Sequence, residues 1–239
     1  DIGVNNGNIF GFPYTEEEAE VILIPVPWDA TASYGRGTSS GPMEILKAST
    51  QIDFFHPEVE TAWNTKIFMT PISEDWKKIN DKLAERTAKY MHFLENGGEL
   101  KVNKEHQETI DEVTVAQNYL RDNLKTKSVQ AIKNAQIVGV LGGEHSCPLG
   151  LIDALAENNK AFGILQLDAH ADLRKGYEGF EQSHASVMYN ALQHKSVTSL
   201  VQVGVRDISQ DEVDFIKSDS RITTFYDWEL KHKQFEGAF

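Results

Sequence analysis

The second half of the chain alternates between apolar runs and helical segments so regularly that few folds remain open to it. Strands are expected at residues 137–141, 163–167, 199–205 and 222–226, and helices at 146–157, 184–194 and 209–217. Strands that alternate with helices are typical of a parallel sheet covered on both faces. We therefore predict a three-layer α/β/α domain with a central, mostly parallel sheet.

The first half supplies further pieces of such a domain. Strands are expected at Val21–Val26 and Lys66–Met69, and long amphipathic helices at Ser73–Leu94 and 104–134. A short buried helix is expected to begin at Pro42 and to include Ile45 and Leu46. Residues 1–20 indicate an arm or loop, and Lys231–Phe239 a polar tail.

Two acids and a histidine follow the predicted strand at 163–167. Asp168, His170 and Asp172 would project to one side if the chain stayed extended. Carboxylates and an imidazole at the carboxyl end of a parallel strand suit a divalent ion such as Mn²⁺ or Zn²⁺. The alternative is a polar loop that caps a helix.

The strand at 137–141 ends in a comparable way. Gly142 and Gly143 permit a tight turn before Glu144 and His145, and Ser146 is expected to cap the next helix. If the two strands are neighbours, His145 lies beside the acidic cluster. A histidine that is only structural is the alternative, but two such strand ends in succession favour a shared metal centre.

Composition narrows the function classes. The 239 residues suffice for one domain with a substantial core, and the net charge of −13 argues against a nucleic-acid surface. The one cysteine, Cys147, cannot staple the fold, which favours a reducing cytoplasmic location, and we expect it to be a buried, inert thiol. No run is long and apolar enough for a membrane span, no signal peptide is visible, and we expect no membrane partner.

Four ordered motifs together resemble the ureohydrolases, the family of arginase and agmatinase. They are Gly35-Arg36-Gly37-Thr38-Ser39-Ser40-Gly41-Pro42, Gly142-Gly143-Glu144-His145-Ser146, Asp168-Ala169-His170-Ala171-Asp172 and Ser183-His184-Ala185-Ser186. The resemblance covers roughly residues 20–206 and favours the agmatinase-like branch. Without it, the first motif would be a flexible loop and His184 a surface residue.

The resemblance implies a site with two Mn²⁺ ions, for which Ni²⁺ is an alternative. His145, Asp168 and Asp172 would bind one ion, and His170 with Asp168 the other. The ions would activate a water for attack on a guanidinium carbon, and His184 would give a proton to the leaving nitrogen. Glu144 would orient the metal ligands from behind.

The loop between the acidic cluster and His184 is a candidate for substrate contacts. Glu178 and Glu181 would meet a cationic tail, and Tyr177 would pack against its methylene groups, although such loop residues are commonly just solvated. Arg206 and Asp207 face the same rim or simply pair with each other.

One part of the family pattern is missing. The family carries a later strand that ends in Ser-x-Asp-x-Asp and completes the metal pair, and this sequence has no such motif. We therefore expect a single ureohydrolase-like domain over 1–239 that is incomplete at its C-terminus and lacks its last strands. Such a chain would bind metals weakly and hydrolyse nothing.

The resemblance implies an enzyme of polyamine metabolism that hydrolyses agmatine to putrescine and urea, acting on a small guanidino substrate as a homo-trimer or homo-hexamer. Guanidine, guanidinobutyrate, arginine and formiminoglutamate are alternative substrates. A metal-poor structural or regulatory relative is an alternative from another class. A dinucleotide-binding module is disfavoured because no Gly-x-Gly-x-x-Gly follows a strand.

Overall fold

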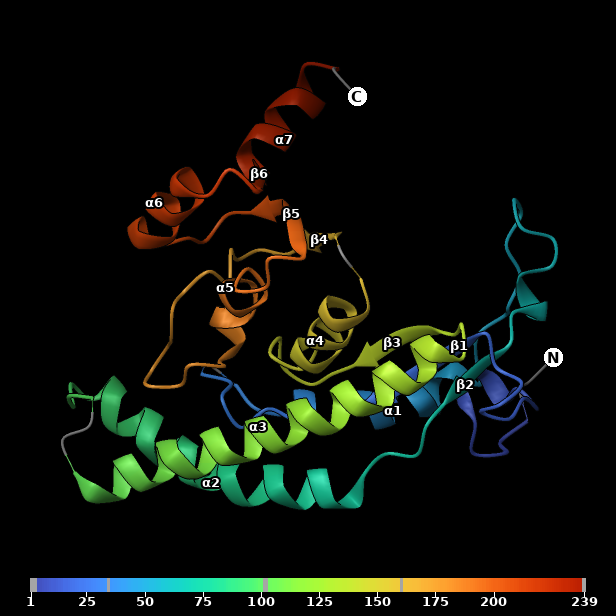
Figure 1. Cartoon of the computed structure of the whole chain (residues 1–239), viewed down its shortest axis with the longest axis horizontal. Coiled ribbons are helices and arrows are strands. Elements are labelled where there is room, and N and C mark those ends of the chain that lie inside the picture. The colour runs from blue at the N-terminus through green and yellow to red at the C-terminus, as the bar shows by residue number, and fades with distance from the viewer. Residues whose placement is uncertain (1–3, 34, 101–102, 160, 238–239) are drawn as a thin grey trace.

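The apolar runs form parallel strands and the amphipathic segments form helices, which confirms the α/β fold (Figure 1). The computed structural model describes residues 4–33, 35–100, 103–159 and 161–237. The strands are β1 (Val21–Pro25), β2 (Ile67–Met69), β3 (Ile137–Leu141), β4 (Phe162–Leu167), β5 (Val197–Val205) and β6 (Ile222–Tyr226). The α-helices are α1 (Gly41–Ser49), α2 (Glu74–Glu95), α3 (Lys104–Lys133), α4 (Leu149–Asn158), α5 (Val187–Ala191), α6 (Gln210–Ser218) and α7 (Asp227–Phe235).

The strands form two parallel sheets rather than the single central sheet that we expected. One sheet has the order β2-β1-β3 and the other the order β4-β5-β6. In the first, Val21 of β1 aligns with Ile137 of β3, and in the second, Ile164 of β4 aligns with Leu200 of β5. No hydrogen-bonded ladder joins β3 to β4 in the described part of the chain, so each of these strands has an open edge.

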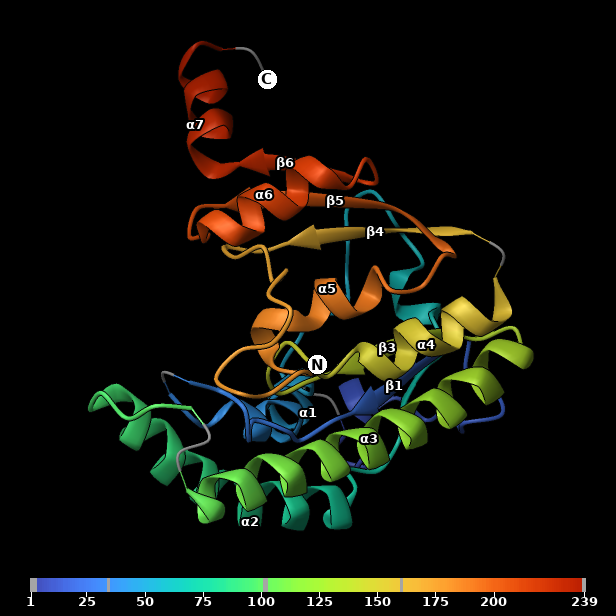
Figure 2. The ribbon, with the colours of Figure 1, turned by 60° about the vertical axis from the view of Figure 1, so that its left-hand side comes forward.

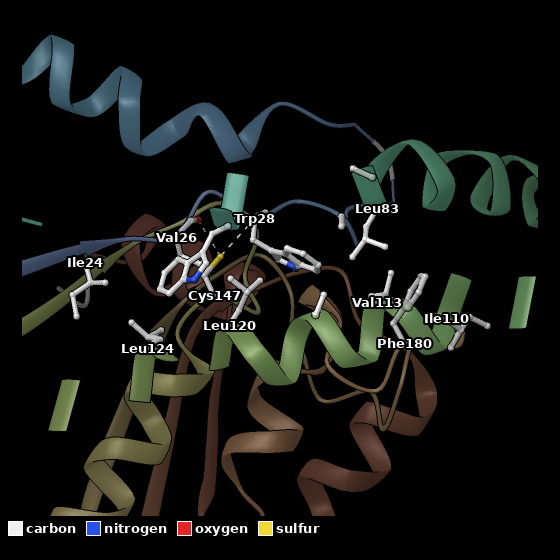
Figure 3. Packing of buried hydrophobic residues seen from close by; sticks show 14 of the residues in the cluster. Ile24, Val26, Trp28, Leu83, Ile110, Val113, Leu120, Leu124, Cys147 and Phe180 are labelled. Carbon is white, nitrogen blue, oxygen red and sulfur yellow. Dashed lines mark hydrogen bonds between the residues drawn. The ribbon is translucent and has the colours of Figure 1, made fainter. Parts of the chain in front are cut away.

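The first sheet packs against α2 and α3, which lie side by side along one flank of the molecule (Figure 1). The side chains of Ser73 and Asn103 cap these helices by accepting hydrogen bonds from backbone N–H groups in their first turns. Helix α3 buries the apolar stripe that its periodicity predicted, and α2 buries Trp76, Leu83 and Tyr90 of its stripe, with Ile79 and Leu94 partly buried. Figure 3 shows the resulting core, in which side chains of α2 and α3 meet those of β1 and the loop after it.

The second sheet is covered on one face only among the described residues. Side chains of α5 pack against Val197, Leu200 and Val205 of β5 to form a second core. On the other face, Leu165 is 66 % exposed and Leu167 is 74 % exposed. Parallel sheets normally bury both faces, so the expected third layer is incomplete at this point (Figure 2).

Four local predictions were wrong. Helix α1 forms where it was expected but is not buried, as the 43 % exposure of Ile45 shows. The reason is that α1 contributes no residue to either hydrophobic core. The predicted helix at 184–194 is shortened to α5 by a 3-10 turn at His184–Ser186. The predicted polar tail begins inside helix α7, whose first turn carries the acids that favour a helix start. The cap of α4 is Pro148 rather than Ser146.

Residues 1–3 of the predicted arm and 238–239 of the predicted tail lie outside the described residues. Among the helices of the described segments, none combines the length and the apolar character that crossing a bilayer requires.

Candidate metal centre

The ends of β3 and β4 deliver three metal-ligand groups to one point. The Nδ1 atom of His145 lies 2.5 Å from Oδ2 of Asp172 and 3.0 Å from Oδ2 of Asp168. Each of the three residues offers one donor atom, and these three atoms lie within 4.8 Å of one another. A nitrogen and two carboxylate oxygens so close together are a donor set that suits Mn²⁺ or Zn²⁺.

The route by which these groups meet differs from the predicted one. Strand β4 ends at Leu167, and residues 168–172 do not continue as an extended chain. The side chain of Asp168 accepts a hydrogen bond from the backbone N–H of His170 at 2.8 Å, and Asp172 has a left-handed φ of 54°. This turn sends Asp168 and Asp172 toward His145, although β3 and β4 are not paired.

The same turn separates His170 from the three-donor group. Its Nδ1 lies 3.4 Å from Oδ1 of Asp168, and its Nε2 lies 3.6 Å from Oδ2 of Asp207. The side chain of His170 is 58 % exposed, yet it lines the same cleft, of about 700 Å³, as His145 and Asp168. The described residues thus bring together one three-donor group and only the beginning of a second.

Electrostatics keep the three-donor group charged. Burial opposes a charge on His145, but its hydrogen bonds to Asp168 and Asp172 outweigh this and raise its pKa to about 10. Burial likewise opposes a charge on Asp168, while contacts with His145 and with the His170 N–H lower its pKa to about 2. Burial raises the pKa of Asp172 despite its contact with His145. At neutral pH the cluster therefore holds a proton on His145, at the position that a cation would take.

His184 lines this cleft as well, next to Ser33. Its Nδ1 lies 2.9 Å from the carbonyl oxygen of Thr31, and the ring of Tyr177 meets it edge-on with 5.7 Å between the centroids. The Glu144 carboxylate, which we expected behind the metal ligands, lies 3.5 Å from the His184 Nδ1 instead. Sequence reasoning also missed Thr31 and Ser33, whose only signal was their place in the loop after β1.

The loop residues predicted to contact substrate lie in different places. Tyr177 lines a cavity of about 240 Å³ next to His184 and stacks beneath the Arg174 guanidinium, 4.8 Å from its ring centre. One carboxylate oxygen of Glu178 is buried and has no hydrogen-bond partner among the described residues. Glu181 is exposed, and neither acid lines the clefts described above.

Three nearby residues, Cys147, Arg206 and Asp207, are not part of the donor group. Cys147 is buried in the first core, and burial raises its pKa well above the usual range, as an inert thiol requires (Figure 3). Asp207 approaches His170, and Arg206 donates to the Gly204 carbonyl, so in the described structure these two neighbours do not pair with each other.

The loop after β1 is fixed to the rim of the cleft by a buried acid. Asp29 is 1 % exposed, and its carboxylate accepts hydrogen bonds from the backbone N–H groups of Gly37 at 2.8 Å and Ser39 at 3.2 Å. Asn80 of α2 donates to the same carboxylate at 3.0 Å. Burial disfavours the charge on Asp29, but these donors outweigh it and lower its pKa. Asp29 therefore ties the backbone of Gly37 and Ser39 to helix α2, next to Thr38, which lines the cleft.

Several ureohydrolases are similar to this chain in sequence or in fold. N(1)-aminopropylagmatine ureohydrolases from Synechocystis sp. and Thermococcus kodakarensis are 25 % and 30 % identical to the chain over 89 % and 86 % of its length. The chain spans only 59 % and 58 % of those relatives. The crystal structure of agmatine ureohydrolase of Thermoplasma volcanium aligns with 98 % of this chain, and the alignment covers 66 % of the ureohydrolase chain. The TM-score of 0.65 at 20 % identity shows a shared fold.

A model of the arginase family matches residues 19–238, a range that contains the described strands β1 to β6 and the described residues that line the cleft. This match shows that the chain belongs to the arginase family.

Proposed function

We propose that the cleft is the metal-binding part of a hydrolase site that cleaves a guanidino C–N bond and yields urea and an amine. The observation that supports this most directly is the convergence of His145, Asp168 and Asp172 on one point. His184, a group able to carry a proton at neutral pH, lines the same cleft. Membership of the arginase family agrees with this chemistry.

The residues present fit a divalent cation, with His145, Asp168 and Asp172 as its ligands and His170 beside Asp168 for a second. A bound pair of such ions supplies a water made nucleophilic near neutral pH. We propose Mn²⁺, with Ni²⁺ as the alternative. The chain's own contribution is to hold the ligands, to orient the guanidino group and to protonate the leaving nitrogen from His184.

We further propose that the described residues form only part of the site. The group around His170 contains too few donors for a second ion, and the sequence has no Ser-x-Asp-x-Asp. The open edges of β3 and β4 are places where further strands can pair. The relatives are longer than the region that this chain matches. Additional carboxylates would come from polypeptide that corresponds to the unmatched part of the relatives. The 239-residue chain alone should therefore bind metal weakly and hydrolyse nothing.

For the substrate we propose agmatine or a guanidine with a longer polyamine tail. Two of the relatives are named for N(1)-aminopropylagmatine, and the net charge of −13 favours a cationic substrate. Tyr177 is placed to pack against a methylene chain beside His184. Tail contacts to Glu178 and Glu181, a homo-oligomeric assembly and a cytoplasmic location remain predictions.

The experiment combines metal binding with urea release. The chain should bind Mn²⁺ in calorimetry, and His145→Ala and Asp168→Ala should abolish binding. Urea release from agmatine, N(1)-aminopropylagmatine, arginine, guanidinobutyrate and guanidine should stay at background for residues 1–239. Urea release should appear in a longer polypeptide that adds a strand ending in Ser-x-Asp-x-Asp, and it should be fastest with agmatine and N(1)-aminopropylagmatine.

Two results would contradict the proposal. Robust turnover by the 239-residue chain would show that the site is already complete. If wild-type chain bound no Mn²⁺ or Ni²⁺ at all, the scarcity of donors around His170 would instead favour a non-catalytic relative that uses the fold for assembly.

A further inference from the structure

Glu144 is a buried acid whose contacts lie away from the metal ligands. The residue is 8 % exposed, and one of its carboxylate oxygens accepts the Thr31 hydroxyl hydrogen bond at 2.7 Å. The other oxygen accepts from the Ser146 hydroxyl. A buried carboxylate needs a compensating charge as well as hydrogen bonds, and among the described residues the His184 imidazole, 3.5 Å away, supplies it.

Thr31 fixes which ring nitrogen of His184 carries the proton. Its backbone carbonyl lies 2.9 Å from the His184 Nδ1, and a carbonyl oxygen can only accept. In the neutral ring the hydrogen must therefore be on Nδ1. The Nε2 atom then points to the cleft, where the Ser33 hydroxyl lies 3.4 Å away. Thr31 serves both partners, since its carbonyl holds the ring and its hydroxyl holds Glu144.

We propose that Glu144 is the positioning residue of the proton donor: together with Thr31 it holds His184 with Nδ1 toward the protein and Nε2 toward the substrate. This differs from the expectation that Glu144 orients the metal ligands. The role as proton donor rests on the proposed function, whereas the orientation and charge of the ring do not.

The arrangement gives a balanced proton transfer. As the guanidino C–N bond breaks, its electron pair goes to the leaving nitrogen, which takes the hydrogen from Nε2 of the cationic ring. Water supplies the oxygen of urea. The ring is left neutral with its hydrogen on Nδ1, still bonded to Thr31, so it needs no reorientation before it takes up the next proton.

The charges around His184 favour its cationic form. Burial lowers its pKa, but the contacts with Glu144 and the Thr31 carbonyl, together with the charge of Asp172, outweigh burial and the net direction is upward. From the loop before it, Glu178 adds a negative charge, and Arg174 shares the adjoining cavity as an opposing positive one. Among the described acids, Glu144 is the one whose carboxylate lies within 4.0 Å of a ring nitrogen of His184.

Nuclear magnetic resonance of the histidine side chains tests the proposal on the 239-residue chain with a chelator and without substrate. In wild-type protein the neutral His184 should carry its hydrogen on Nδ1. Glu144→Gln keeps the shape but removes the charge, and should lower the pKa of His184 by at least about one unit, a tenfold loss of proton affinity. Glu144→Asp should retain most of the wild-type value.

The internal control is His194, whose ring contacts Asp153 at 2.8 Å and whose resonances should be the same in wild-type protein and in both Glu144 variants. If Glu144→Gln left the pKa of His184 unchanged and shifted the pKa of His145, the proposal would be overturned and Glu144 would be assigned to orienting the metal ligands. Should Glu144→Gln fail to fold, the wild-type spectrum still decides, because a neutral His184 with its hydrogen on Nε2 contradicts the geometry. None of these outcomes depends on hydrolysis.

Discussion

A cation that binds His145 must displace a proton, and the structure sets the size of this competition. The pKa of His145 is about 10, so the ring is protonated at pH 7 and cannot offer a lone pair to a metal. A gap of about three pKa units corresponds to at most ~4 kcal/mol. Because the side chain is 37 % exposed, water screens the ion pairs, and we take about half of this value, ~2 kcal/mol.

Affinity for Mn²⁺ should therefore rise by about five- to tenfold between pH 7.0 and 8.0, with about one proton released per ion bound. Calorimetry in two buffers of different ionisation enthalpy measures both quantities. His145→Ala should abolish the proton release, and His92→Ala, which removes an imidazole that is 78 % exposed, should leave it unchanged. A dissociation constant that is the same at both pH values, with no buffer-dependent heat, would refute the reasoning.

Three further predictions concern stability and reactivity. Because the pKa of His145 is about 10 in the fold and about 6.5 in the unfolded chain, its protonation stabilises the metal-free fold fully below pH 6.5 and progressively less as pH rises toward 10. The melting temperature in chelator should therefore fall over this pH range, and His145→Ala should flatten the slope. Leu124 is 1 % exposed, so Leu124→Ala should cost about 2–5 kcal/mol in urea unfolding, whereas Val115→Ala on the same helix, at a position 69 % exposed, should change it by less than about 0.5 kcal/mol. Cys147 should not react with a thiol reagent in native buffer, and one thiol per chain should react in denaturant. Rapid labelling of Cys147 in native buffer would contradict its burial.

The periodic parts of the fold could be predicted because local pattern and tertiary packing agree there. The long helices α2 and α3 carry an apolar stripe and a capping residue, and β3 is a short apolar run that is followed by two glycines. Helix α7 was missed because its apolar residues, Trp228, Leu230 and Phe235, do not form a continuous stripe and none of its residues is buried. Its helical state shows in acids at the start and basic residues at the end.

The geometry of the cleft was predictable only in part. Asp168, Asp172 and His145 meet as the sequence pattern suggested, but through a turn with a left-handed residue instead of a continued strand. That turn moves His170 outward, and no spacing rule for an extended chain could show it. The contact between Glu144 and His184 joins residues far apart in the chain, so it depends on how the loop after β1 folds back.

The most direct test of the metal centre is anomalous diffraction from crystals of the chain soaked in Mn²⁺. We predict a manganese peak within about 2.0–2.4 Å of Nδ1 of His145 and of one carboxylate oxygen each of Asp168 and Asp172. A peak elsewhere, or a His145 ring that keeps its hydrogen bonds to the two acids at saturating Mn²⁺, would contradict the assignment of these residues as metal ligands.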